Sequence, residues 1–412
     1  MAEKEKRCQV IMSDGSPCGR VLHDKEFCFL HSPKEGRGAD IFQNELNKIF
    51  NDKSLKIYDF TGFIFPDGIL FPKIIDKKII FFAAGFRGMA DFGGATFNNE
   101  ADFRLAVFEK SGIFSDTTFY DKVYFSLTFF KGLAEFTNST FYKGVSFEKA
   151  FIEDILIVDE EGKNKIISKE EVDFRHVEFL HPEKVRFRKV DLSKFRFSRT
   201  DLRKVEFIDV EWYRKSKKKG INKIYDEIKT EPGMKKFDYS LIAQTYKRLR
   251  ANYEENLYYA EAGDFFIGEM DMRRKGEKNI INKIFLCLYK FFSHYGESFR
   301  RPLGLMALLL LTFPLLYMIA GIAPSEKMSG DGIQRLINYE WDFCFKNMKL
   351  SSEMWDDYKS CLLYSISAMS LVREKPFYPS YFSGYALTIL EYILMVVFIS
   401  FFILALRRRF RR

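Results

Sequence analysis

The sequence predicts a multidomain protein made of a repetitive β domain, an α-helical segment and two membrane-spanning helices. Phe accounts for 46 of the 412 residues and returns at intervals of five or six through most of residues 57–212. Residues 302–323 and 385–406 are apolar, and each stretch is long enough to cross a bilayer. Three cysteines and a histidine crowd the N-terminus. These patterns divide the chain into a large polar part and a C-terminal membrane part.

Residues 1–35 carry a candidate metal site formed by Cys8, Cys18, Cys28 and His31. Three thiolates and one imidazole suit tetrahedral Zn²⁺, and four protein ligands leave no open coordination position. We therefore expect a zinc knuckle with a structural role, in a compartment that keeps thiols reduced. The spacing resembles small zinc knuckles, some of which are attached to DNA-binding proteins. The alternative is three incidental cysteines in a disordered tail.

The Phe repeat predicts an extended chain wound around a narrow core. Two interleaved sets of rings, each with a period of eleven, run through its centre: Phe92, Phe103, Phe114, Phe125, Phe136 and Phe147, and Phe97, Phe108, Phe119, Phe130 and Phe141. A small or β-branched residue stands two positions before each ring, as at Ala90, Ala101 and Val123. Residues i and i−2 lie on the same side of an extended backbone, so both side chains point inward.

This pattern resembles the pentapeptide-repeat proteins of the Phe-rich subtype, with the signature A-D-F-x-x-A-x-F, over residues 57–212. The resemblance implies a right-handed quadrilateral β-helix with four faces per coil, or roughly 6.5 coils stacked at the usual strand spacing. Residues 153–171 interrupt the repeat, and we expect them to form a looped-out insertion.

The inward rings fill the core, so any function belongs to outward residues, the insertion and the ends. Some soluble members of the family resemble DNA in shape and bind topoisomerases through an acidic surface. This chain differs, because residues 172–219 contain 15 Lys and Arg against 8 Asp and Glu. The candidates for contact with anionic lipid headgroups are Arg186, Arg188, Lys189, Lys217, Lys218 and Lys219. The alternative is a solvated rim.

Residues 220–298 are predicted to form a helical neck. Apolar residues recur at spacings of three and four over residues 237–274, which indicates two packed helices. The segment is similar to a helical pair, A-G-D-F-Y-x-x-E-M-x-x-R-R, that follows the repeats in membrane-bound relatives. The matching residues are Ala262, Gly263, Asp264, Phe265, Phe266, Glu269, Met270, Arg273 and Arg274. We interpret Glu269 and Asp271 as part of a solvated helix face.

Residues 299–412 are predicted to form the membrane module, with spans at 302–323 and 385–406. Arg300 and Arg301 precede the first span, and five arginines within residues 407–412 follow the second. The positive-inside rule then places both termini in the cytosol of a cell-membrane protein. Residues 324–384 form an outer loop, in which Cys344 and Cys361 either pair in a disulfide or remain unpaired.

The outer loop contains a candidate re-entrant half-helix, because apolar residues follow helical spacing over a stretch too short to cross. Two spans with such a helix between them resemble the two-helix, pore-loop ion-channel module, in which several subunits, often four, surround a pore. Potassium filters need T-x-G-Y-G, whereas the pore candidates here are Ser367, Ser370, Arg373 and Glu374, so the filter is degenerate. Glu391 in the second span either lines a pore or reaches the outer interface.

The sequence shows no nucleophile–base pair, phosphate-binding glycine loop or open metal site, so we expect no enzymatic activity. The leading hypothesis is a homo-oligomeric, tetramer-like channel module with a degenerate filter, regulated or docked through its cytosolic β-helix. A competing hypothesis is a membrane-anchored scaffold that binds a cytosolic protein and conducts nothing. A third is a membrane-tethered nucleic-acid-binding protein, although a nucleic acid is not the partner that we expect.

Overall fold

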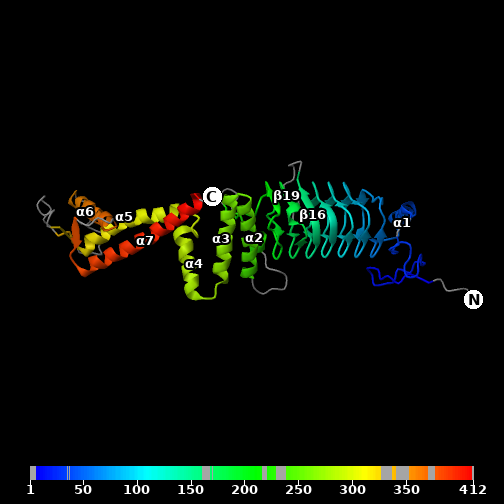
Figure 1. Cartoon of the computed structure of the whole chain (residues 1–412), viewed down its shortest axis with the longest axis horizontal. Coiled ribbons are helices and arrows are strands. Elements are labelled where there is room, and N and C mark those ends of the chain that lie inside the picture. Colours follow the sequence, from blue (N-terminus) through cyan, green and yellow to red (C-terminus); the bar gives the residue numbers. More distant parts are fainter. Residues whose placement is uncertain are drawn as a thin grey trace, which may run out of the picture. The chain divides into compact units, whose positions relative to one another are not determined.

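The computed structural model describes residues 6–34, 36, 38–159, 168, 170–215, 220–228, 238–325, 336–339, 352–369 and 376–410. The chain divides into two compact units, Met1–Gly276 and Glu277–Arg412. The first unit contains the repeats and the second contains the long apolar helices (Figure 1).

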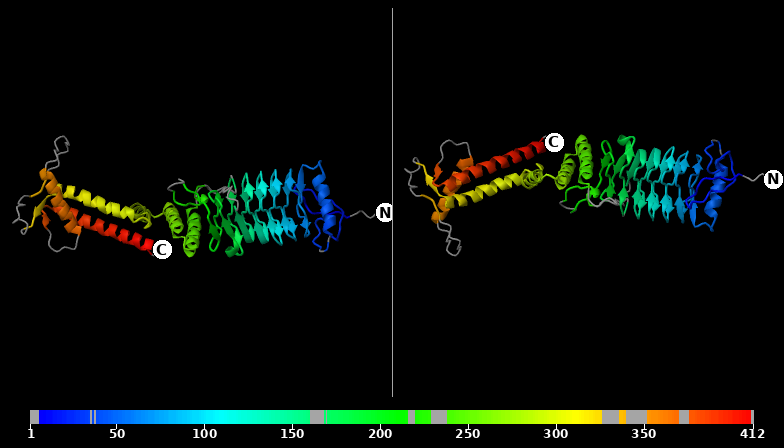
Figure 2. Two further views of the ribbon diagram at one scale, coloured as in Figure 1. Left: turned by 90° about the horizontal axis from the view of Figure 1, so that it is seen from above. Right: turned by 90° about the horizontal axis from the view of Figure 1, so that it is seen from below.

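The repeats form a β-helix whose short parallel strands lie on four faces (Figures 1 and 2). The first face contains β1 (Ile57–Asp59), β4 (Lys78–Ile80), β8 (Ala101–Asp102), β12 (Val123–Tyr124), β15 (Val145–Ser146), β17 (Val172–Asp173) and β20 (Phe195–Arg196). The second contains β2 (Ile64–Phe65), β5 (Gly85–Phe86), β9 (Val107–Phe108), β18 (Glu178–Phe179) and the first parts of β13 (Phe129–Glu135) and β16 (Phe151–Val158).

The third face combines the later parts of β13 and β16 with β6 (Ala90–Asp91), β10 (Gly112–Ile113), β19 (Arg186–Arg188) and β21 (Glu206–Ile208). The fourth contains β3 (Ile74–Ile75), β7 (Thr96–Phe97), β11 (Thr118–Phe119) and β14 (Thr140–Phe141). Seven successive strands on the first face correspond to about six coils. The predicted β-helix is therefore confirmed as a β-solenoid of about six turns.

Phe rings stack along the inside of the β-helix, one ladder behind each face. On the first face, the ring centroids of Phe81, Phe103 and Phe125 are 4.9 Å apart at each step. On the second, each step from Phe86 to Phe108 and on to Phe130 is 4.6 Å. The rings of the second and third ladders meet edge to face, which is the other favourable arrangement for aromatic pairs.

The small residue before each ring is buried even where it is polar. The hydroxyl groups of Thr117 and Thr128 donate to the carbonyl oxygens of Phe92 and Phe103, at 3.0 and 2.8 Å. A hydroxyl at this position can therefore enter the apolar interior without leaving a polar group unpaired.

The structure differs from the sequence expectation at the start of the insertion. Residues 153–158 belong to β16, whose Asp154–Leu156 segment pairs with Leu133–Glu135 of β13. Alternate apolar side chains explain this extension, because Ile155 and Ile157 point into the core and are buried. Residues 160–167 and 169 lie outside the described residues.

The first coil is covered by helix α1 (Ala39–Asn51) and by the N-terminal knuckle. The Phe42 ring of α1 lies 5.4 Å from that of Phe65. The backbone N–H of Ile64 donates to the carbonyl of Leu30 at 2.9 Å. Two different elements therefore cover the end of the core that would otherwise be exposed.

The last coil is covered by helices α2 (Tyr239–Glu255) and α3 (Tyr259–Gly276), which pack on each other. The indole N–H of Trp212 donates to the Tyr253 hydroxyl at 2.8 Å, and the ring of Phe265 lies 5.2 Å from that of Trp212. A Cβ at Gly268 would come within 2.4 Å of the Tyr246 ring, so the two helices approach closely only because residue 268 is glycine. Short 3₁₀ turns at Pro182–Lys184 and Tyr225–Glu227 complete this unit.

Glu269 of α3 is buried, contrary to our expectation of a solvated face. Its carboxylate pairs with Arg250 of α2 at 2.9 Å and with Arg273 at 2.6 Å. The two arginines supply the opposite charge that a buried carboxylate requires.

The second unit contains helices α4 (Ile280–Ser293), α5 (Arg300–Ala320), α6 (Ser352–Met369) and α7 (Phe382–Phe410). Helices α5 and α7 run side by side, and α6 contacts both (Figures 1 and 2). Strands β22 (Ile322–Pro324) and β23 (Phe377–Pro379) pair antiparallel beyond the end of α5. Helices α5 and α7 are long and apolar enough to cross a membrane.

Candidate metal centre

Three short bridges bring the N-terminal cysteines together. Arg7 pairs with Val21 and Ile11 with Pro17, so Cys8 and Cys18 lie on neighbouring segments. The backbone N–H of Cys8 donates to the Arg20 carbonyl at 2.8 Å, and that of Cys18 donates to the Val10 carbonyl at 2.7 Å. A tight turn after Cys28 then returns His31 to the same point, with the His31 N–H 3.1 Å from the Cys28 carbonyl.

The ligand atoms of Cys8, Cys18, Cys28 and His31 all lie within 4.8 Å of one another, as the sequence predicted. The Nδ1 atom of His31 is 3.5 Å from the sulfur of Cys8 and 3.2 Å from that of Cys28, and the sulfurs of Cys18 and Cys28 are 3.9 Å apart. Ligands around a tetrahedral zinc, with bonds of about 2.0–2.3 Å, are separated by roughly 3.3–3.8 Å. The cluster could therefore hold a metal ion of this kind.

The surroundings of His31 determine which ring nitrogen faces the cysteines. Its Nε2 atom is 2.9 Å from the carbonyl oxygen of Thr61, in the first coil of the β-helix. A carbonyl accepts only, so Nε2 carries the proton and Nδ1 presents its lone pair to the cluster. The same contact connects the candidate site to the β-helix.

The electrostatic setting also fits a cation with thiolate ligands. Burial raises the pKa of the Cys28 thiol to about 12, so its thiolate requires a compensating positive charge. The guanidinium of Arg20 donates to the Cys18 sulfur at 3.5 Å and offsets part of the negative charge of three thiolates. The His23 imidazole packs against Phe29 instead, outside the cluster.

Glu391 of α7 lies in a hydrogen-bonded cluster between the three large helices of the second unit. Its two carboxylate oxygens accept hydrogen bonds from the Tyr317 hydroxyl of α5 at 2.7 Å and from the Ser365 hydroxyl of α6 at 2.5 Å. The Glu391 side chain is fully buried. The sequence singled out Glu391 but neither partner, because both come from other helices and carry no motif.

Of the other pore candidates, Ser367 lies among the described residues. Ser367 is buried in α6, and its hydroxyl donates to the Tyr364 carbonyl at 2.7 Å. Ser370, Arg373 and Glu374 lie outside the described residues, and so does Cys344, the candidate disulfide partner of Cys361. Cys361 itself is buried in α6.

Of the basic residues proposed for lipid contact, Arg186 and Arg188 lie in β19 on the third face of the β-helix, and Lys189 directly follows this strand. Arg188 and Lys189 are exposed, whereas Arg186 is half-buried and donates to the Lys184 carbonyl. Lys217, Lys218 and Lys219 lie outside the described residues.

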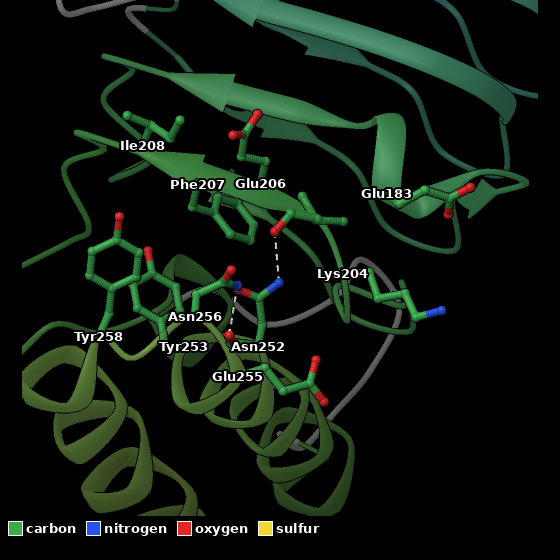
Figure 3. Close-up of a pocket in the computed structure, with 11 residues that line it drawn as sticks. Glu183, Lys204, Glu206, Phe207, Ile208, Asn252, Tyr253, Glu255, Asn256 and Tyr258 are labelled. Carbon is green, nitrogen blue, oxygen red and sulfur yellow. Dashed lines mark hydrogen bonds between the residues drawn. The ribbon is translucent and has the colours of Figure 1, made fainter. Parts of the chain in front are cut away.

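A cavity of about 420 Å³, which the sequence did not predict, lies between β21 and helix α2 (Figure 3). Asn252 donates to the carbonyls of Leu202 and Val205, at 2.8 and 2.7 Å, and so fixes the helix against the last coil. The remaining lining combines aromatic, charged, aliphatic and amide side chains: Phe207, Tyr253, Tyr258, Glu183, Glu206, Glu255, Lys204, Val205, Ile208 and Asn256. The lining residues include no cysteine, histidine or serine that would provide a nucleophile or a metal ligand.

Comparison with known families supports this description of the β-helix. A family model described as pentapeptide repeats, nine copies, matches residues 114–156. No curated protein and no solved structure was found to match the chain. The repeat match, the parallel faces and the stacked rings together show a β-solenoid that contains pentapeptide repeats, and the Cys₃His cluster near the N-terminus could hold a metal ion.

Proposed function

We propose that this protein is a two-span integral membrane protein that presents a zinc-capped β-helix in the cytosol as a docking scaffold for another protein. The observation that carries the proposal is the outward direction of apolar side chains on α5 and α7. Exposed examples are Leu303, Leu308, Leu311, Ile389, Ile393 and Ile403. Soluble proteins rarely expose continuous apolar surfaces of this extent, whereas lipid-facing helices require them.

The distribution of charge supports the same proposal. Within α5 and α7, arginines lie only at the ends, at residues 300–301 and from residue 407 onward. The one acidic residue, Glu391, is buried and hydrogen bonded. Both helices could therefore cross the hydrocarbon region without exposing a charge to lipid, with their arginine-bearing ends in the cytosol.

Zinc is the metal that suits the N-terminal cluster best. Cysteine sulfur and imidazole nitrogen are its preferred ligands, and a closed set of four is typical of a structural site. When bound, the metal would hold the knuckle against the first coil through the contact of His31 with Thr61. No catalytic step is assigned to it.

The hydrogen bonds that the Glu391 carboxylate accepts within its own chain favour a scaffold over a pore. A carboxylate that lines an aqueous pore must be reached by water or ions. Here the Glu391 side chain is fully buried, and both of its oxygens accept hydrogen bonds from the same chain. The outward residues of the β-helix, and not the membrane segments, then provide the working surface.

The channel-like oligomer remains the second candidate, and a specific observation favours it. Helix α6 lies in the segment between the two spans and packs on both of them. This arrangement is what the resemblance to a pore-loop module implies.

Alkaline extraction and flotation of the full-length protein test the membrane assignment. We expect the chain to stay with the lipid after alkaline washing and to require detergent for release. Recovery in the aqueous fraction would exclude both candidates. Planar-bilayer recording of the purified protein then separates them, because a scaffold gives no current whereas a channel gives a current that Glu391→Gln alters.

A further inference from the structure

Helix α4 precedes the first proposed span and has one face packed on α7. The ring of Tyr289 lies 5.7 Å from that of Phe401, and the ring of Phe292 lies 5.2 Å from that of Phe398. Asn279 caps the helix by accepting the Ile281 N–H at 2.9 Å. The helix is therefore well defined at its start and held within the second unit.

A second apolar face of α4 is largely exposed in the part of the chain that the structure describes. Ile280 is 74% exposed, Phe285 66% and Phe291 63%. At 100° per residue these side chains share a surface with Ile281, Ile284 and Leu288, which are exposed as well. Lys283 and Lys290 lie together at one edge of this surface.

Helix α4 lies at the arginine-bearing ends of the two long helices. The Arg301 guanidinium donates to the Lys290 carbonyl at 3.1 Å, and that of Arg408 donates to the Tyr295 carbonyl at 2.8 Å. Helix α4 also runs steeply across the direction of α5 and α7 (Figure 1). If α5 and α7 cross a bilayer, α4 therefore lies along its cytosolic surface.

We propose that α4 is an interfacial helix that inserts its exposed apolar face into the anionic cytosolic leaflet. This inference rests on the membrane assignment above. An amphipathic helix in this position buries its apolar face at the boundary of headgroups and acyl chains. Leu303, in the first turn of α5, is exposed as well, and Lys283 and Lys290 provide the charge that anionic headgroups attract. A bilayer matches the apolar face, its position beside the first proposed span and the lysines together.

Tryptophan quenching in vesicles tests the proposal with the full-length protein. The variant Phe285→Trp places a reporter on the apolar face, and Leu70→Trp places a matched reporter at a 73% exposed position of the β-helix. The fluorescence of the unsubstituted protein is subtracted, since it already contains Trp212, Trp341 and Trp355. The vesicles contain phosphatidylglycerol and lipids brominated on their acyl chains.

We expect brominated lipid to remove most of the fluorescence added by Phe285→Trp and none of that added by Leu70→Trp. Aqueous iodide should give the reverse result. Adding Lys283→Glu and Lys290→Glu to the Phe285→Trp variant should reduce its quenching by brominated lipid.

Two results would overturn the proposal while the membrane assignment stands, provided that the protein resists alkaline washing. In the first, the residue 285 reporter is quenched by iodide and not by lipid, so α4 is in water. In the second, neither quencher reaches it, so α4 is covered by protein, such as a second copy of the chain. Loss of the protein from washed vesicles would instead contradict the membrane assignment and this inference together.

Discussion

In the β-helix the large apolar side chains point inward, whereas in residues 277–412 many of them point outward. Phe103 is fully buried, with the rings of Phe81 and Phe125 each 4.9 Å away. Phe285 of α4 is 66% exposed, and Ile389 of α7 is 63% exposed. Under the proposed membrane assignment, the same residue types are placed in two apolar environments, because a protein core and a lipid bilayer both exclude water.

The comparison shows that the spacing of apolar residues carries more information than their number. A period of five or six with small residues between the rings builds its own interior. A helix formed by a continuous apolar stretch is apolar on every side, so an apolar environment must surround it. The following experiments test whether inward and outward side chains contribute differently to stability.

The largest effect is expected from removing a ligand of the metal site. Cys28→Ser should reduce bound zinc from one per chain to close to none, because structural zinc contributes about 10–16 kcal/mol in isolated fingers. The unfolding temperature of the β-helix should fall with it, since the knuckle covers the first coil. Metal analysis and circular dichroism of the purified protein measure the two effects. His23→Ala is the control and should retain the metal; equal zinc in both variants would remove the assignment of Cys28 as a ligand.

The same change, Phe to Ala, at one buried and one exposed position tests directly how burial determines the effect on stability. Phe103→Ala should destabilise the β-helix by about 3–5 kcal/mol, as large-to-small changes do in packed cores. Phe285→Ala should change the free energy of unfolding by less than about 0.5 kcal/mol, as surface changes do. Denaturant titrations in detergent, followed by the β-sheet signal, give both values. Similar losses for the two variants would contradict the contrast.

Glu227 is expected to stabilise the cap of the last coil in a pH-dependent way. Burial opposes its ionisation, yet Lys223 at 2.8 Å, the Tyr246 hydroxyl at 2.8 Å and Lys275 at 3.2 Å keep its pKa below the ordinary 4.5. The unfolded carboxyl binds protons more readily, so this stabilisation is complete above pH 4.5 and is lost as the pH falls through the folded pKa.

Glu227→Gln should therefore cost about 1.5–3 kcal/mol at neutral pH, the usual contribution of hydrogen bonds to a charged group. Its stability should also vary less with pH below 4.5 than that of the parent protein. Thermal unfolding over a range of pH measures this difference. Glu255→Gln, at an exposed carboxyl of α2, is the control and should behave like the parent.

The smallest effect is expected on the outer surface of the β-helix. Lys143 pairs with Asp121 of the previous coil at 3.0 Å, and the Lys143 side chain is half exposed. Exposed ion pairs contribute about 0.2–1 kcal/mol, and salt screens them. Lys143→Ala should therefore cost under about 1 kcal/mol in dilute buffer and less in high salt, measured by thermal unfolding. A cost comparable to that of Phe103→Ala would show that outward pairs, and not only inward rings, stabilise the β-helix.

The sequence predicts the β-helix and the metal cluster well because both depend on local spacing. Each Phe ring specifies its own face, and the turn between Cys28 and His31 is short enough to be recognised. The partners of Glu391 could not be predicted, since Tyr317 and Ser365 come from helices whose packing no periodicity describes. Glu269 was misread for the same reason, because its burial depends on Arg250 from the neighbouring helix.

The extension of β16 shows a different limit of prediction from the sequence. Asp154 and Glu153 break the apolar pattern, so the sequence favours a loop after residue 152. In the structure Ile155 and Ile157 still face inward, and the strand turns the corner from the second face to the third. A strand longer than the repeat unit has no counterpart in the five-residue signature.

The strand register has a consequence for how this protein can change in length. Residue 79 pairs with residue 101, residue 101 with residue 123 and residue 123 with residue 145, so each of these central coils takes 22 residues. Deleting residues 101–122 would remove one full coil, about 4.8 Å of height, and bring Val123 into the register of Ala101. The β-helix can therefore be shortened or lengthened by one coil at a time in evolution. Each such change alters the distance between the knuckle and the helical cap and leaves both ends intact.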